Sequence, residues 1–408
     1  MNDATFVIVG ANLTGGAAAQ TLRAHGFDGR LVLIGAESLP PYERPPLSKE
    51  YLRGEKPAER TRLLAPDWYA ENVVDLRLGV RATRLDLDHG AVELEDGERV
   101  AFDRLLLATG GRNRRLRVPG EDLPGVHQLR TLADADAIKA EAAPGRTAVV
   151  VGASFIGSEV TASLRSLGVE VELLDPSPSP LFKVLGPEIS GLYLDIHRSH
   201  GVRFHPRQRV AEIRGDGRFE AVVTRDGLTV EGDFLVAGVG IEPVTELAEG
   251  TPIAVDNGIL VDAWCRTNLD GIFAAGDVAN HDHPLFGRRM RVEHWDNALK
   301  QGAAAARTML GEGTPYDDPH WFWSDQYDHN LQYVGQAVRW DEMVVRGSIE
   351  ERNFVAFYLD EGRVEGVVGM DRGKDVRRAR ALVRKTVEPA LLKDEDVDLK
   401  ALGKAAHG

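Results

Sequence analysis

The stretch FVIVGANLTG (residues 6–15) decides how the chain is expected to fold. Its first four residues, Phe6–Val9, are apolar and contain no turn former, which is typical of a buried parallel strand. A turn from Gly10 to Gly16 follows, and then a small-residue helical segment over 17–25. A strand, a glycine turn and a helix in this order match the G-x-G-x-x-G fingerprint of a dinucleotide-binding unit, in which the helix N-terminus attracts a pyrophosphate.

The first fingerprint is degenerate, because Asn12 stands at its middle glycine position. Asparagine tolerates left-handed backbone better than most residues, but its side chain takes space that a phosphate needs. A second strand over 31–34 leads to Glu37, whose carboxylate is placed to accept a hydrogen bond from a ribose hydroxyl. Taken alone, this match is weak support for a nucleotide site.

The pattern then occurs a second time, in TAVVVGASFIG (residues 147–157). Ser154 replaces its middle glycine, a helix is expected over 158–167, and a strand over 169–174 ends at Asp175. Two copies predict two dinucleotide sites in one chain. Asp175 favours NADH over NADPH, because a carboxylate there accepts from the 2′-hydroxyl and repels a 2′-phosphate. The downstream cations Lys183 and Arg198 would partly offset that preference.

Length and composition limit the number of domains and the kinds of partner that the chain can have. A chain of 408 residues exceeds the roughly 250–300 at which a single core stops growing, so two or three domains are expected. The net charge of −14 argues against nucleic acid as a partner. No apolar run reaches the roughly 20 residues that cross a bilayer, and Met1-Asn2-Asp3 lacks the basic start of a secretory signal, so a cytoplasmic protein without membrane contact is expected.

The numbers and positions of the cysteines and histidines argue against a disulfide, an iron–sulfur cluster and a metal site. Cys265 is the single cysteine, so the chain can form neither an internal disulfide nor a four-thiolate iron–sulfur cluster. The His281-x-His283 pair is interpreted as a loop feature rather than a zinc site, and no metal is expected.

Four further segments carry recognisable patterns. A strand over 103–107 enters the turn Ala108-Thr109-Gly110, and FAAGD (residues 273–277) is a strand ending at Asp277. The other two are the proline-rich PYERPPLSK (residues 41–49), which is too stiff for a helix interior, and WFWSDQ (residues 321–326).

The order of fingerprint, ATG turn, second fingerprint and FAAGD resembles the two-dinucleotide flavoprotein superfamily that includes glutathione reductase. PYERPPLSK, LRT (residues 129–131), RVEHWDNALKQG (residues 291–302) and WFWSDQYDHNLQ (residues 321–332) are similar to a narrower family. These are the NADH-dependent ferredoxin and rubredoxin reductases of oxygenase systems, of the putidaredoxin reductase and biphenyl dioxygenase reductase type.

The resemblance implies an α/β fold with two Rossmann-like dinucleotide-binding domains and an α+β C-terminal domain. The expected boundaries are 1–110 and 241–315 for a discontinuous FAD domain, 111–240 for an inserted NAD domain and 316–408 for the C-terminal domain. The expected FAD contacts are Gly10, Asn12, Thr14, Gly15, Glu37, Arg44, Lys49, Ala82, Ala108, Thr109, Gly110, Arg130, Asp277, Glu293, His294 and Trp295. The expected NADH contacts are Gly152, Ser154, Phe155, Ile156, Gly157, Glu159, Asp175, Lys183 and Gly240.

The resemblance also implies that Lys49, paired with Glu159, compensates the negative charge of reduced flavin. Pro45 and Trp323 complete the expected catalytic set, and Tyr42, Trp295 and Trp321 are candidates to wall the flavin edge. Buried core aromatics are the competing interpretation of the tryptophans.

The missing cysteines indicate where the electrons go. Disulfide reductases of this superfamily need a cysteine pair after the second strand, where this chain has Pro40–Lys49. Electrons are therefore expected to pass to a separate carrier. The family resemblance implies that this carrier is a ferredoxin of the 2Fe-2S type that serves a cytochrome P450 or a Rieske dioxygenase. An NADH oxidase that reduces oxygen, and an NADH-sensing flavoprotein resembling apoptosis-inducing factor, remain alternatives.

Ferredoxins are usually acidic, so a basic docking patch is expected on a monomer or weak homodimer. The candidate cations lie on a predicted helix of the C-terminal domain, with a second group before residue 292; they are Arg372, Lys374, Arg377, Arg378, Arg380, Arg384, Lys385, Arg288, Arg289 and Arg291.

Overall fold

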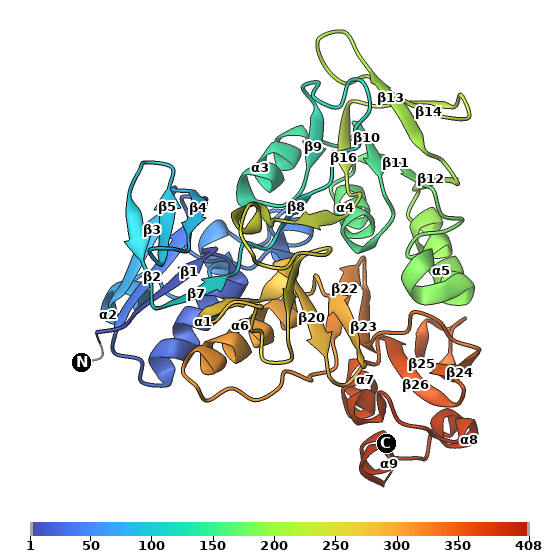
Figure 1. Cartoon of the computed structure of the whole chain (residues 1–408). Helices are drawn as coiled ribbons and strands as arrows, with labels where there is room; N and C mark the ends of the chain where they lie inside the picture. Colours follow the sequence, from blue (N-terminus) through green and yellow to red (C-terminus); the bar gives the residue numbers. More distant parts are fainter. Residues whose placement is uncertain (1–2, 406–408) are drawn as a thin grey trace. The chain divides into compact units, whose positions relative to one another are not determined.

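The computed structural model describes residues 3–405, which separate into two compact units, each assembled from three segments of the chain (Figure 1). Unit 1 contains the residues up to Glu43, Glu59–Arg112 and Glu242–His320. Unit 2 contains Arg44–Ala58, Asn113–Ile241 and the residues from Trp321 onward. The chain therefore passes from unit 1 to unit 2 inside the proline-rich motif.

Unit 1 is built on a parallel five-stranded sheet in the order β19-β7-β1-β2-β3. The strands and helices of this unit are β1 (Thr5–Val9), α1 (Leu13–Ala24), β2 (Arg30–Gly35), α2 (Trp68–Glu71), β3 (Val74–Leu78), β4 (Ala82–Asp86), β5 (Ala91–Leu94), β6 (Arg99–Ala101), β7 (Arg104–Leu107), β18 (Ile259–Val261), β19 (Ile272–Ala274), β20 (Ala279–His283), β21 (Arg288–Arg291) and α6 (Trp295–Met309). The short 3₁₀ turns are η2 (Ala58–Thr61), η3 (Glu246–Ala248) and η4 (Gly276–Val278). The chain changes unit within β8 (Gly111–Asn113) and β17 (Ile241–Pro243).

Unit 2 contains a second parallel sheet, in the order β12-β11-β10-β16-β9. The elements around it are η1 (Pro45–Ser48), β9 (Val126–Gln128), α3 (Leu132–Glu141), β10 (Thr147–Val151), α4 (Phe155–Ser166), β11 (Glu170–Asp175), α5 (Phe182–Ser199), β12 (Arg203–Pro206), β13 (Val210–Arg214), β14 (Ala221–Thr224), β15 (Thr229–Glu231) and β16 (Phe234–Ala237).

The two parallel sheets follow one plan. In each, the strand before the fingerprint is central and the next two strands lie on one side, as in a dinucleotide-binding fold. The other side holds β7 and β19 in unit 1, and β16 and β9 in unit 2. Helices cover one face, α1 and α6 in unit 1 and α3 and α4 in unit 2. A three-stranded sheet covers the opposite face, β4-β5-β6 in unit 1 and β13-β14-β15 in unit 2. Because both faces are covered, the central strands β1 and β10 are apolar and buried at every position after their first threonine.

The last part of unit 2 is an antiparallel five-stranded sheet in the order β22-β23-β26-β25-β24, followed by short helices. Its elements are β22 (Trp321–Gln326), β23 (His329–Gly335), β24 (Glu342–Ser348), β25 (Asn353–Asp360), β26 (Arg363–Met370), α7 (Gly373–Ala379), η5 (Arg380–Leu382), α8 (Pro389–Lys393) and α9 (Leu399–Ala405). Apolar residues of α5 pack on this sheet, among them Leu185 and Tyr193 against Phe322 and Phe354. The fold class expected from the sequence is confirmed, with two Rossmann-like sheets and an α+β C-terminal part.

The structure corrects the expectation that the basic run of residues 372–385 lies on one helix. Helix α7 ends at Ala379, and Arg384 and Lys385 lie beyond η5. Arg372 is ion-paired with Asp375 and Glu395, and Arg384 with Glu365. Lys374, Arg377 and Arg378 are the exposed cations that remain on α7, and of these Arg378 also lies 3.7 Å from Asp375.

None of the helices within residues 3–405 is long and apolar enough to cross a membrane.

The His-x-His pair lies on strand β20 rather than in a loop, which corrects the sequence interpretation. Both side chains point to the same side of the strand and are buried, with ring centroids 5.2 Å apart. Burial lowers the pKa of His281 to about 4 and also lowers the pKa of His283. Both rings are therefore neutral at physiological pH.

Stability is expected to fall in acid because of buried histidines, of which His281 in unit 1 and His197 in unit 2 are the clearest. Burial lowers the pKa of each from 6.5 to about 4. Because the folded-state pKa lies below the unfolded value, full stability is present above about pH 6.5 and is lost as the pH falls towards 4, by about 3 kcal/mol for each histidine.

Urea unfolding at pH 7 and at pH 4.5 measures this loss. The variant His281→Leu should lose less stability between the two pH values than the wild type. His89→Leu, a change at an exposed histidine that is ion-paired with Asp86, is the control and should lose no less stability than the wild type. Identical losses in the wild type and His281→Leu would contradict the assignment.

Candidate functional site

The first fingerprint forms a tight cradle between β1 and α1. Gly10 has φ +124°, and a Cβ added there would lie 2.0 Å from the carbonyl oxygen of Ala108, so only glycine fits. Ala108 follows β7, the neighbour of β1 in the sheet. The two turns expected to contact FAD, after β1 and after β7, are therefore adjacent at the carboxyl edge of the sheet, where nucleotides bind in such folds.

Asn12 has a defined structural task in this cradle. Its backbone is extended (φ −121°), not left-handed, and it is the N-cap of α1. Its side-chain oxygen accepts from the amides of Thr14 (3.0 Å) and Gly15 (3.3 Å), and its Nδ2 donates to the oxygen of Ala108 (2.6 Å). The sequence interpretation, which weighed Asn12 for tolerance of left-handed backbone, missed this capping role.

Thr14 lies at the meeting point of three segments of unit 1. A Cβ on Gly276 would come within 2.3 Å of the Thr14 hydroxyl oxygen, and one on Gly302 within 2.5 Å of its carbonyl oxygen. Asp277 directly follows Gly276, so the FAAGD turn and the start of α1 are neighbours. The close approaches show that neither Gly276 nor Gly302 can carry a side chain, because their backbones lie directly against Thr14.

The other expected FAD contacts of unit 1 are distributed around the same sheet. Glu37, beyond β2, accepts a hydrogen bond from the hydroxyl of Tyr42 (2.5 Å), and Ala82 begins β4. Thr109 donates to the oxygen of Val244 at 2.6 Å, and Gly110 has φ +70°.

The start of α6 holds the remaining expected contacts of unit 1. His294 is the N-cap of α6 and Trp295 its first residue. Burial lowers the pKa of His294 to about 4, so its ring is neutral. Glu293 is ion-paired with Arg291 at 2.7 Å, which removes that arginine from the docking candidates.

The second fingerprint, in unit 2, has the same close packing of its first glycine as the first fingerprint. Gly152 has φ +101°, and a Cβ there would lie 2.4 Å from the oxygen of Gly238, the residue after β16. The carboxylate of Asp175 accepts from the amides of Ala153 and Ser177, each at 2.7 Å. Asp175, the residue expected to favour NADH over NADPH, is thus held by hydrogen bonds against the fingerprint turn.

The second fingerprint lacks the internal cap of the first. Ser154 is the N-cap of α4, but its hydroxyl donates to the oxygen of Gly238 (3.3 Å), and its side chain makes no capping bond to the helix. The N-terminal amides of α4 are therefore not occupied by that side chain, and a phosphate can approach them.

The remaining expected NADH contacts lie on or near α4 and α5. Phe155 packs edge-on against Phe322 of β22 (4.8 Å between ring centroids), and Ile156 is 44% exposed. Lys183 is exposed on α5 and Gly240 has φ +93°. Gly157 lies in the first turn of α4.

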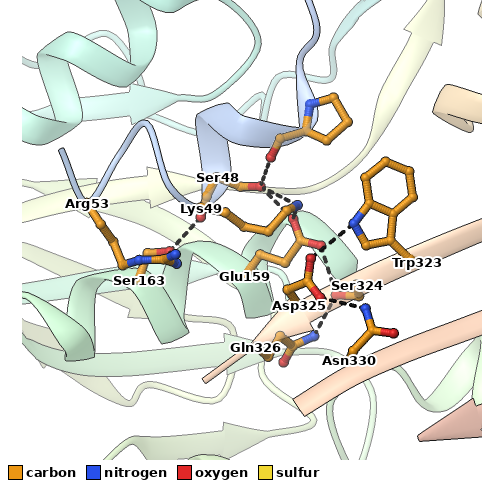
Figure 2. Close-up of polar contacts among 11 residues, drawn as sticks. Ser48, Lys49, Arg53, Glu159, Ser163, Trp323, Ser324, Asp325, Gln326 and Asn330 are labelled. Carbon is orange, nitrogen blue, oxygen red and sulfur yellow. Dashed lines mark hydrogen bonds and ion pairs between the residues drawn. The ribbon is translucent and has the colours of Figure 1, made fainter. Parts of the chain in front are cut away.

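A buried ion pair is the main polar feature of unit 2 (Figure 2). The Lys49 Nζ atom lies 2.7 Å from Glu159 Oε2, and both side chains are at most 5% exposed. Lys49 follows η1, and Glu159 lies on α4 with its carboxylate directed at the proline-rich segment. The pairing expected from the family resemblance is confirmed.

Several residues that sequence reasoning missed surround this pair. The hydroxyl of Ser48 donates to Glu159 Oε2, and the hydroxyl of Ser324 on β22 donates to Oε1 at 2.8 Å. Ser163 of α4 donates to the backbone oxygen of Ser48 at 2.7 Å. Ser48 and Ser324 both lie in motifs that the sequence marked, but neither motif shows which side chains meet.

Further bonds fix the proline-rich segment within unit 2. Tyr51 donates to Asp136 at 2.6 Å, and Leu52 is fully buried in the core beneath α3 and α4. Arg44 donates to the backbone oxygen of Arg130, which brings two expected FAD contacts together. The backbone oxygen of Pro45 lies 3.3 Å from the Ser48 hydroxyl oxygen, whose single hydrogen is donated to Glu159 at a shorter distance.

Trp323 lies on the face of β22 opposite to Ser324. Its indole N–H donates to Asp325 at 3.0 Å, and its ring stacks on Trp321 at 5.2 Å. Both rings are partly exposed, which argues against the interpretation that they are core aromatics.

Cys265 lies in unit 1 and is fully buried. Burial raises the pKa of its thiol, so the sulfur is protonated and unreactive at neutral pH.

The contrast between the two N-caps predicts unequal costs of substitution. Asn12→Ala removes two capping bonds and should lower the free energy of unfolding by about 1 kcal/mol. Ser154→Ala removes no capping bond and should change it by less than about 0.5 kcal/mol. Urea unfolding of the apoprotein measures both, and equal losses would show that Asn12 does not cap α1.

Comparison with known proteins agrees with this geometry. Residues 4–302 match the family described as pyridine nucleotide-disulphide oxidoreductase, and residues 321–403 match the reductase C-terminal family. The ferredoxin–NAD(+) reductase component of the anthranilate 1,2-dioxygenase system of Burkholderia cepacia is 39% identical over 97% of this chain and 98% of its own. Rhodocoxin reductase of Rhodococcus erythropolis is 38% identical over 97% and 93%.

Solved structures give the same result. The crystal structure of the covalent putidaredoxin reductase–putidaredoxin complex superposes with a TM-score of 0.95 at 36% identity, covering 99% of both chains. The chain therefore belongs to the pyridine nucleotide-disulphide oxidoreductase family, within its branch that carries the reductase C-terminal domain.

Proposed function

We propose that this protein is an FAD-containing NADH:ferredoxin reductase that supplies electrons singly to an iron–sulfur protein serving an oxygenase. The observation that carries the proposal is the similarity over nearly the whole chain to reductases named for ferredoxin and NAD(+). FAD and NADH are the cofactors that membership of this family implies, and both fingerprint cradles fit a nucleotide.

The cradle of unit 1 is assigned to the ADP part of FAD. Gly10, Thr14 and Gly15 would accommodate the pyrophosphate, and Asp277 would bind the ribityl side. Asn12 must share the amides of Thr14 and Gly15 with the phosphate, because its side chain accepts from the same two groups.

The second cradle is assigned to NADH. The open N-terminus of α4 would receive the pyrophosphate, and Asp175 would accept from the ribose 2′-hydroxyl. The carboxylate is already held by two backbone amides, so it is pre-positioned, and a 2′-phosphate would meet a fixed negative charge.

Lys49 and Glu159 are assigned to the redox centre. Bound FAD would accept hydride from NADH and release its two electrons one at a time. Lys49 supplies a positive charge that favours the reduced, negatively charged flavin, and Glu159 fixes the ammonium group and balances its charge before reduction. A buried ion pair of this kind contributes more to positioning than to stability.

The electrons then leave through a partner protein. Cys265 is the only thiol, and it is buried with a raised pKa, so no disulfide relay is available. We include in the proposal a 2Fe-2S ferredoxin as the acceptor, a cytoplasmic location, and a monomer or weak homodimer.

Anaerobic stopped-flow spectroscopy, in which the protein is first mixed with NADH and then with a 2Fe-2S ferredoxin, tests the proposal. Rapid flavin reduction and re-oxidation by ferredoxin are expected. Slow re-oxidation by ferredoxin but rapid peroxide formation in air would favour an NADH oxidase. A long-lived reduced complex with NAD⁺ that neither acceptor re-oxidises would favour a sensor.

The docking patch is proposed on the exposed cations of α7, namely Lys374, Arg377 and Arg378. The double variant Arg377→Ala/Arg378→Ala should raise the KM for ferredoxin several-fold at low salt, because rim charges steer association. The difference should shrink as salt is raised towards 0.5 M.

Two comparisons make this test specific. NADH reduction of the flavin should be unchanged in the double variant. Arg209→Ala/Arg225→Ala removes two exposed arginines from the β13–β15 side of unit 2 and should leave the KM for ferredoxin unchanged. If both double variants raised the KM for ferredoxin equally, the docking patch would not lie on α7.

A further inference from the structure

The carboxylate of Glu159 is held at both oxygens by groups from different parts of unit 2. Oε2 accepts from Lys49 and Ser48, which belong to the proline-rich segment. Oε1 accepts from Ser324, which belongs to the C-terminal sheet and is 165 positions away in the sequence. The orientation of the carboxylate therefore depends on a side chain of the C-terminal sheet.

The direction of the Ser324 hydrogen bond is fixed by its neighbours. A carboxylate can only accept, so the single hydroxyl hydrogen of Ser324 is donated to Glu159. The amide nitrogen of Gln326, two residues along the same strand, donates to the Ser324 oxygen at 3.1 Å. Ser324 and Gln326 are both fully buried, so water does not substitute for either group.

Strand geometry explains why these two side chains act together. Residues 322, 324 and 326 are the buried positions of β22, whereas Trp321, Trp323 and Asp325 alternate to the partly exposed face. β22 is paired along its whole length with β23, so Ser324 is fixed by the C-terminal sheet and not by a loop.

We infer that Ser324 is a positioning residue, which orients the Glu159 carboxylate so that Oε2 faces Lys49. The inference rests on the proposed function, because Lys49 and Glu159 matter to the reaction only if they serve hydride transfer to FAD. It gives the C-terminal sheet a part in the redox step of the reaction. Gln326 supports the same arrangement by fixing the Ser324 hydroxyl.

Ser324→Ala tests the inference in the holoenzyme. Without the bond to Oε1 the carboxylate can rotate away from Lys49, so anaerobic reduction of the flavin by NADH should slow roughly three- to tenfold. The Kd for NADH should stay within about twofold, because the bond does not touch the coenzyme. Ser324→Thr keeps the hydroxyl and should restore most of the rate.

Ser190→Ala is the matched control. Ser190 is a fully buried serine of unit 2 whose hydroxyl is hydrogen-bonded to Ser179, not to Glu159. It should reduce flavin at the wild-type rate. A comparable slowing in Ser190→Ala would attribute the effect to general loosening of unit 2 and overturn the inference.

A double-mutant cycle with Glu159→Gln gives a second readout that does not depend on the cofactor. In the apoprotein, the urea midpoint shifts caused by Ser324→Ala and Glu159→Gln should be less than additive, because both changes weaken the same hydrogen bond. In the holoenzyme, Ser324→Ala should change the flavin reduction rate less than about twofold once Glu159 is Gln. Additive effects in both measurements would overturn the inference.

The wild-type protein separates this inference from the proposed function. Failure of wild-type flavin to be reduced by NADH would contradict the function itself. Normal wild-type reduction together with an unchanged rate in Ser324→Ala would contradict only the role of Ser324.

Discussion

The buried ion pair between Lys49 and Glu159 is the interaction on which the organisation of unit 2 depends. Two ionisable groups that are at most 5% exposed are costly to bury, and here each is compensated by the other and by hydrogen bonds. The donors to Glu159 come from two segments, the proline-rich segment and β22, and Glu159 itself lies on a third, α4. The carboxylate of Glu159 thus links all three sequence segments from which unit 2 is assembled.

Local patterns predicted the framework of the fold well. The two fingerprints predicted two Rossmann-like sheets because strand, glycine turn and helix are encoded by neighbouring residues. The stiffness of Pro40–Lys49 predicted a segment that could not be a regular helix, and the structure has only a 3₁₀ turn there, η1. The Lys49–Glu159 pair was expected from family resemblance, since no local pattern relates residues 110 positions apart.

What sequence reasoning missed depends on tertiary contacts. The fingerprint pattern treats Asn12 as a flawed glycine, whereas its side chain caps α1 because Ala108 lies beside it in the folded chain. The basic run after residue 372 looked continuous, but acids from other elements pair with Arg372 and Arg384. Ser324 lies in the WFWSDQ motif, but only the folded chain shows that its hydroxyl meets Glu159, 165 positions away.

The cysteine content distinguishes this chain from the disulfide reductases that share its fold. The family is named for a disulphide, yet this chain has one thiol, and that thiol is buried in unit 1. Where the disulfide reductases of the superfamily carry their redox cysteines, this chain has Lys49 and the residues that hold it. The same framework therefore serves electron release to a partner in place of internal thiol exchange.

The midpoint potential of the bound flavin in Lys49→Met tests the central claim most directly. If Lys49 compensates the charge of reduced FAD, removing it should make the two-electron potential more negative by about 30 mV or more, since 30 mV corresponds to about 1.4 kcal/mol for such a couple. An unchanged potential in a variant that still binds FAD would contradict the account.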